Sequence, residues 1–117
     1  MKTLALILLL FSTTAHAEWS EKDTQRQLIF TGLAALDWGQ TRYIAKHPDE
    51  YYERNPLLGA HPTTGRVDGY FTSSILLHWG ISAMLPDKWR KYWQYTGIAV
   101  ETGAVANNYS LGIRLDF

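Results

Sequence analysis

Two long helical patterns are joined by the connector Tyr51-Tyr52-Glu53-Arg54-Asn55-Pro56-Leu57-Leu58-Gly59-Ala60-His61-Pro62. Prolines, a glycine and an Asn-Pro step interrupt helical geometry here, and ionisable side chains lie between them. With its flanks the connector spans about twenty residues, which is long for a compact domain and typical of functional loops. Its aromatic and apolar content favours an ordered loop. We therefore expect a helix on either side and any chemistry beside this connector.

The segment before the connector has the pattern of one long helix. Ser20 and Asp23 occupy the two positions of a capping box. The helix is predicted to run to about Lys46, because the residue before Pro48 is pushed out of helical geometry. Spacings of three and four predict a buried stripe of Phe30, Leu33, Asp37, Thr41 and Ile44. An ionisable carboxylate, that of Asp37, therefore lies within the buried stripe.

Two further helices are predicted after the connector. Thr63 or Thr64 caps a helix over about 66–85, and Pro86 has the first-turn position of another over about 87–107. This third helix starts with basic residues that we expect to face water, namely Lys88, Arg90 and Lys91.

The last residues are predicted to leave the helix. Asn107 and Asn108 mark its end, because asparagine tolerates the left-handed conformation of a helix cap. Residues 109–117 alternate apolar and polar side chains, which predicts an extended segment packed back across the bundle. The predicted fold class is all-α, with three long antiparallel helices, an ordered connector and a short extended C-terminal tail.

The N-terminus has the three parts of a secretory signal. Met1-Lys2 is a short positive start, residues 3–11 are apolar, and residues 12–17 end in the small-residue site Ala15-His16-Ala17. The apolar run is much shorter than the roughly 20 residues that span a bilayer. We predict a signal peptide at 1–17 and a single helical domain at 18–117, exported to the periplasm or inner membrane of a bacterium.

Composition narrows the classes of partner. Eleven basic and eleven acidic residues give zero net charge among 117 residues, so the chain has no electrostatic footprint for nucleic acid. Cysteine is absent, so stability has to come from packing, lipid or a partner rather than from disulfides. Aromatic residues make up 14% of the chain and suit surfaces that meet lipid or another protein.

Three antiparallel helices bring several titratable side chains to similar depths below the connector. Asp37, His78 and Glu101 are expected roughly 9 to 18 Å from the helix ends at that side. Glu53 and His61 could close over them from the connector. All five are candidate catalytic residues, and Asp37, His78 and Glu101 are candidate ligands of a divalent metal.

A structural polar network is the alternative to a catalytic or metal site. Metal-binding helices usually carry close pairs such as Glu-x-x-His, which this chain lacks. A buried Glu101 needs a partner, for which Arg42 or His78 would serve. No motif of a serine hydrolase, zinc protease or phosphate-binding loop occurs. No cofactor is predicted, and a divalent metal stays the alternative.

The sequence leaves open whether the bundle is membrane-bound or soluble. Residues 28–45, 69–85 and 92–113 approach spanning length, and aromatic residues lie near their ends. Four side chains that are costly in hydrocarbon lie inside these segments, namely Asp37, Arg42, His78 and Glu101. A bundle embedded in or lying on the inner membrane from the periplasmic side and a soluble periplasmic bundle both fit.

A resemblance extends over most of the chain after the signal. It is carried by Leu36-Asp37-Trp38-Gly39-Gln40-Thr41, the Glu53-x-Asn55-Pro56-x-Leu58-Gly59-x-His61-Pro62 pattern, Tyr70-Phe71, Leu85-Pro86 and residues 101–108. These runs resemble small exported or membrane proteins of bacteria and their phages. The resemblance implies no activity and no site residue.

These features predict an exported, non-enzymatic protein of the cell envelope that acts through contacts with lipid or another envelope protein. The alternative is a small membrane-facing hydrolase or metal-binding protein that uses the Asp/Glu/His cluster. A third hypothesis is a phage-type accessory protein that acts on the host envelope.

Overall fold

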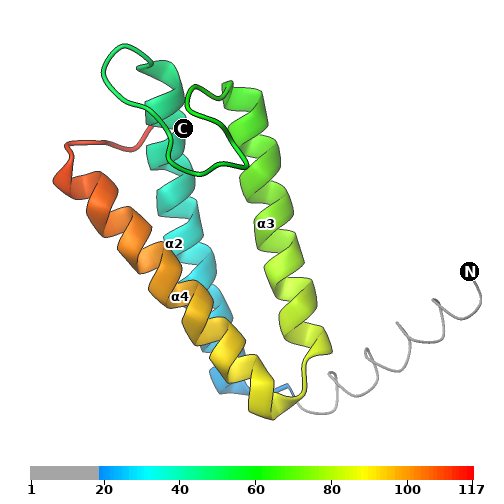
Figure 1. Cartoon of the computed structure of the whole chain (residues 1–117). Helices are drawn as coiled ribbons and strands as arrows, with labels where there is room; N and C mark the ends of the chain where they lie inside the picture. Colours follow the sequence, from blue (N-terminus) through cyan, green and yellow to red (C-terminus); the bar gives the residue numbers. More distant parts are fainter. Residues whose placement is uncertain (1–18) are drawn as a thin grey trace, which may run out of the picture.

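The structure is a computed structural model that describes residues 19–117, so the predicted signal peptide at 1–17 lies outside the described residues. It consists of three helices, α2 (Glu21–Lys46), α3 (Thr64–Met84) and α4 (Asp87–Ser110). Figure 1 shows α3 running opposite to α2 and α4, with the connector at the end where α2 stops and α3 starts. The all-α prediction is confirmed, and the described residues contain no strand.

Local capping explains where the first two helices begin. Ser20 and Asp23 form the predicted capping box, in which each side chain accepts a hydrogen bond from the other residue's backbone N–H. Thr63 caps α3 by accepting from the backbone N–H of Arg66 at 3.1 Å. Both starts therefore follow from residues within one helical turn.

The predicted end of α4 is three residues too early. The helix continues past Asn107 to Ser110 and is followed by Gly112, whose φ of +83° suits glycine. The amide of Asn108 turns inward to the neighbouring helix and does not cap. Only residues 113–117 lie beyond the helix and its turn, so the segment outside the helix is shorter than the predicted segment 109–117.

The short tail packs against α2. The backbone N–H of Asp116 donates to the carbonyl oxygen of Gly39 at 3.0 Å, and Arg42 donates to the carbonyl oxygen of Asp116. Ile113 is buried, whereas Phe117 is exposed although its ring lies over Gly39. The C-terminus therefore returns to α2, as Figure 1 also shows.

The connector is held in place by an apolar anchor and a side-chain turn. Leu58 is buried with Val67 and Phe71 in a core cluster at the start of α3. Asn55 accepts from the backbone N–H of Leu57 at 2.9 Å and donates to the Tyr70 hydroxyl at 2.8 Å. The expected ordering of the connector thus has a physical basis, because the asparagine turn and the buried leucine each fix its path.

The opposite end of the bundle is held by a buried polar network. Arg90 of α4 donates to Asp23 of α2 at 2.8 Å, and both side chains are fully buried. Gln94 donates to the backbone of Asp23, and Ser82 of α3 donates to Gln27 at 2.8 Å. The expectation that Arg90 faces water was therefore wrong, because a buried carboxylate from the first helix pairs with it.

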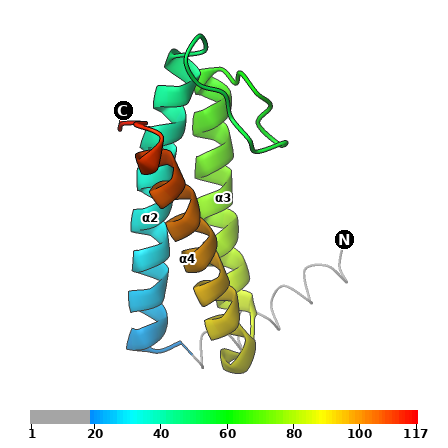
Figure 2. The same ribbon diagram turned by 60° about the vertical axis from the view of Figure 1, so that its left-hand side comes forward.

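The three segments that approached spanning length fall on these helices. Among residues 19–117, no helix combines the length and the apolarity needed to cross a membrane. In Figure 2, α4 passes in front of α2 and α3 and leans across them towards the connector end.

Candidate functional site

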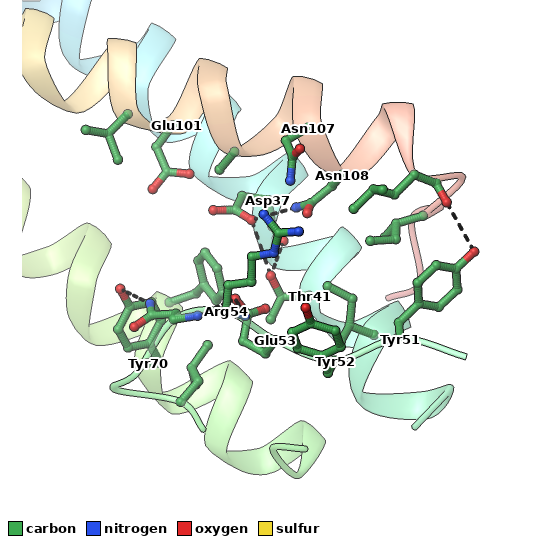
Figure 3. Close-up of a pocket in the computed structure, with 18 of the residues that line it drawn as sticks. Asp37, Thr41, Tyr51, Tyr52, Glu53, Arg54, Tyr70, Glu101, Asn107 and Asn108 are labelled. Carbon is green, nitrogen blue, oxygen red and sulfur yellow. Dashed lines mark hydrogen bonds between the residues drawn. The ribbon is translucent and has the colours of Figure 1, made fainter. Parts of the chain in front are cut away.

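A cavity of about 510 Å³ lies under the connector, between the C-terminal halves of α2 and α4 and the start of α3. Asp37 and Thr41 come from α2, Glu53 from the connector, and Glu101 and Asn108 from α4. Figure 3 shows these side chains gathered around one space, with the carboxyl groups of Asp37 and Glu101 facing each other. The volume is in the range of small-molecule sites in proteins, roughly 300 to 1,000 Å³.

Asp37 and Glu101 form a carboxyl pair that shares a hydrogen bond. Burial raises the pKa of Glu101 to about 9, and the hydrogen bond to Asp37 and its negative charge add to the rise. Burial also raises the pKa of Asp37, whereas the hydrogen bonds from Glu101 and Thr41 lower it in part. At neutral pH Glu101 therefore keeps its proton, through which it can donate a hydrogen bond to Asp37.

Amide and hydroxyl groups hold Asp37 in place. Thr41 Oγ1 donates to the Asp37 carbonyl at 2.8 Å and lies 3.3 Å from its Oδ1. Asn108 Nδ2 lies 3.4 Å from Asp37 Oδ1 and donates to Gln40 Oε1 at 3.0 Å. Because Gln40 in turn donates to the Val105 carbonyl, α2 and α4 are joined at the level of the pair.

Glu53 is a third carboxyl group of the cavity. Its side chain accepts from the backbone N–H groups of Arg54 and Asn55, each at 3.0 Å. Burial raises the pKa of Glu53. The hydrogen bond from the Asn55 backbone lowers this pKa in part, and the negative charge of Asp37 raises it further. The repulsion indicates that Asp37 and Glu53 face the same space without touching.

One oxygen of the pair is left without a partner. Glu101 Oε2 is buried and makes no hydrogen bond within the described part of the chain. Neither partner expected for this carboxyl group reaches it. Arg42 instead contacts both oxygens of Asp68 at 2.6 Å, and His78 lies elsewhere. A buried oxygen without a donor costs roughly 1 to 3 kcal/mol, which favours a ligand or water at this position.

His78 does not join the carboxyl pair. It lies about 21 Å along α3 from the start of that helix, whereas Asp37 and Glu101 lie about 14 Å from the connector ends of theirs. Its ring is stacked between Phe30 and Trp93, with centroids at 3.6 and 4.7 Å. The predicted metal-ligand set is therefore not assembled, and no group of three or more acidic or histidine residues within 19–117 is placed to hold a metal.

The imidazole of His78 belongs to the buried network. Gln27 Oε1 accepts from Ser82 and Gln94, so its amide nitrogen donates to His78 Nδ1 at 2.8 Å. The proton of the neutral ring is then on Nε2, which is buried and has no hydrogen-bond partner among the residues that the structure describes. Burial lowers the pKa of His78 to about 4, so the ring is neutral at physiological pH. His78 thus has the structural role that the alternative reading gave it.

His61, the other predicted histidine, is exposed and does not line the cavity. Of the five candidate residues, the structure therefore brings together Asp37, Glu53 and Glu101. Several lining residues were not predicted, among them Arg54, Tyr70 and Asn108. The Asn-Pro step at Asn55 was the sequence signal that could have indicated Tyr70, because the Asn55 side chain donates a hydrogen bond to the Tyr70 hydroxyl.

Comparison with protein families, with curated proteins and with solved structures found no match to this chain. The function therefore has to be argued from the geometry of the molecule itself.

Proposed function

We propose that the chain is an exported, non-enzymatic protein of the bacterial envelope that works in contact with lipid. The observation that carries this proposal is that polar side chains are buried and large apolar side chains are exposed, the reverse of the usual distribution in a water-soluble domain. All but one of the largest fully buried side chains are polar or charged: Arg90, Gln27, Gln94, Val67, Thr41, Asp23 and Ser82. In a water-soluble domain of this size, apolar side chains would be expected to dominate such a set.

The outer surface is correspondingly apolar. Leu28 and Ile29 of α2, Leu76 and Leu77 of α3, and Val100 of α4 are each more than half exposed. Apolar surface of this kind marks contact with protein or membrane. Because it is spread over all three helices, one protein partner on one face would leave much of it in water. Lipid, which can meet several faces at once, is the better-matched partner.

The start of α4 supports the same assignment. Trp89, Tyr92 and Tyr95 are exposed there, beside Lys88 and Lys91. The two lysine ammonium groups lie 5.5 and 5.3 Å from the centroids of the Trp89 and Tyr92 rings. Aromatic rings next to basic side chains are typical of the interface between hydrocarbon and headgroups. Export is supported by the signal pattern of residues 1–17.

Vesicle flotation tests the lipid contact. The purified mature protein is mixed with vesicles of phosphatidylethanolamine and phosphatidylglycerol, freed of detergent and floated on a density gradient. We expect it to rise with the vesicles, and the Leu76→Asn/Leu77→Asn variant to rise markedly less. Thr72→Asn/Ser73→Asn is the matched control, because both residues are exposed and polar on the same helix. Wild-type protein that stays at the bottom of the gradient contradicts the proposal.

A small hydrolase is the second candidate, and the carboxyl pair is the observation that favours it. A Glu101 that keeps its proton would be the acid of general acid–base catalysis, and Asp37, bonded to it, would be the base. The test is a panel of chromogenic esters, glycosides and phosphate esters. Turnover by the wild type that Asp37→Asn abolishes would establish hydrolysis, and no turnover on any of them would remove it.

A further inference from the structure

We propose that the cavity under the connector binds the ammonium group of a primary amine whose remaining part is apolar or aromatic. This proposal concerns the cavity alone and does not depend on lipid contact by the outer surface. It starts from Glu101 Oε2, a buried oxygen that receives no hydrogen bond from residues 19–117 although Glu101 lines an open cavity of about 510 Å³. A donor supplied by a ligand would satisfy that oxygen.

The charges of the cavity select a cation. Asp37 and Glu53 both line it and repel each other across it. Glu50 lines it too, and Arg54 is the one basic residue of the lining; both are exposed. Because the carboxyl groups outnumber this guanidinium, the lining is acidic overall. A primary ammonium has three N–H donors, enough for Asp37, Glu101 Oε2 and one further oxygen.

The walls select the rest of the ligand. Phe71 and Tyr70 of α3 and Tyr52 of the connector line the cavity, and aromatic faces attract a cation as well as an apolar body. Ile44 of α2 and Ala104 of α4 supply aliphatic surface. Figure 3 shows Tyr52 and Tyr70 across the cavity from the carboxyl pair, whereas the Tyr51 hydroxyl points away to the Leu111 carbonyl. An amine with a compact apolar or aromatic body matches both halves of this lining.

Binding is coupled to a proton. Burial raises the pKa of Glu101 to about 9, so this carboxyl group holds a proton at neutral pH. An ammonium group that contacts both Asp37 and Glu101 would have to displace that proton. A bound cation favours the ionised form of Glu101, so that binding releases the proton to solvent. The affinity for an amine should therefore rise as the pH increases from 6 towards 9.

The probe is 2-phenylethylamine, and 2-phenylethanol is its uncharged counterpart of the same shape. Binding is followed by tryptophan fluorescence, because Trp38 stacks on Phe71 in the cavity wall with centroids 6.1 Å apart. We expect saturable binding of the amine, at least tenfold weaker binding of the alcohol, and at least tenfold weaker amine binding by Asp37→Asn. Asp49→Asn is the matched control, because this exposed carboxylate lies outside the cavity. Circular dichroism verifies that each variant is folded.

Calorimetry in buffers of different ionisation enthalpy measures how many protons are released when the amine binds. We expect net proton release on amine binding at pH 7.5, and none in Glu101→Gln. Equal affinity for amine and alcohol, or unchanged amine binding by a folded Asp37→Asn, overturns the proposal.

Discussion

Replacement of Glu101 by glutamine tests the carboxyl pair most directly. In the folded chain the pKa of Glu101 is raised from 4.5 to about 9, chiefly by burial and then by the hydrogen bond and charge of Asp37. The folded state therefore binds one proton more than the unfolded state between these two values. The stability that this proton provides is complete below pH 4.5 and is lost as the pH rises towards 9. Glutamine still offers an N–H donor to Asp37 but cannot ionise.

The size of the effect follows from the pKa of Glu101. Each pKa unit corresponds to about 1.4 kcal/mol, so the rise from 4.5 to about 9 sets an upper limit of roughly 6 kcal/mol. Glu101 is partly exposed, and water screens its interaction with Asp37, so we take about half of that limit, roughly 3 kcal/mol. In a domain of about 100 residues, 1 kcal/mol changes Tm by roughly 4 to 8 °C.

Thermal unfolding by circular dichroism at pH 5, 7 and 9, in one mild nonionic detergent, measures this difference. We expect Glu101→Gln and wild type to melt within a few degrees of each other at pH 5, and the variant to melt about 10 °C higher or more at pH 9. Asp49→Asn is the control, because it removes an exposed carboxylate outside the cavity. If the Tm values of Glu101→Gln and wild type change in parallel from pH 5 to 9, Glu101 is not held protonated by its surroundings.

Two further substitutions test the opposite end of the bundle by the same unfolding measurement. Gly97→Ala should cost about 1 to 3 kcal/mol, because its new methyl group would lie 2.6 Å from His78 Nε2. Gly103→Ala on the same helix has open space and should gain up to about 1 kcal/mol, so similar effects of the two would refute the close packing. Arg90→Met should cost about 3 kcal/mol, because it removes a buried ion-pair partner. Lys91→Met is the exposed comparison, and equal losses in both would mean that the buried pair adds nothing to stability.

The helix boundaries were predictable where local residues determine them. The capping box of Ser20 and Asp23 and the cap at Thr63 act within one turn; the box was identified from sequence, and Thr63 was one of the two predicted caps. The end of α4 was missed because Asn108 looked like a cap. Its amide instead bonds Gln40, 68 residues away, and no local pattern contains that contact.

The candidate site was predictable in part for a similar reason. Counting residues from the helix ends placed Asp37 and Glu101 at similar depths, and the structure brings them together. The same count failed for His78: α3 starts at Thr64, two residues earlier than predicted, and the ring of His78 is stacked between Phe30 and Trp93 instead. The hydroxyl of Tyr70 reaches the site through the path of the connector, which helix periodicity does not describe.

The polar interior was the least predictable feature. Periodicity analysis assigns charged residues to the solvent face, so Arg90 was placed with its basic neighbours. Its guanidinium instead meets Asp23 and the carbonyl oxygens of Ser82 and Leu85. Burial alone would raise the pKa of Asp23, but hydrogen bonds from Ser20 and Arg90 outweigh it and hold that pKa low. Such a partner set spans three helices, and it becomes visible only when they are assembled.

The polar interior and the apolar exterior support one physical interpretation. The buried hydrophobic residues within 19–117 are Phe30, Ala34, Ile44, Leu58, Val67, Phe71 and Ile113. That is a small core for a domain of about 100 residues, whose stability in water would have to come mainly from buried apolar surface. As proposed, lipid around the helices would remove the cost of exposing Leu76 and Leu77 to water. The same surroundings would favour the protonated form of Glu101, so the lipid contact of the outer surface and the proton held in the cavity would strengthen each other.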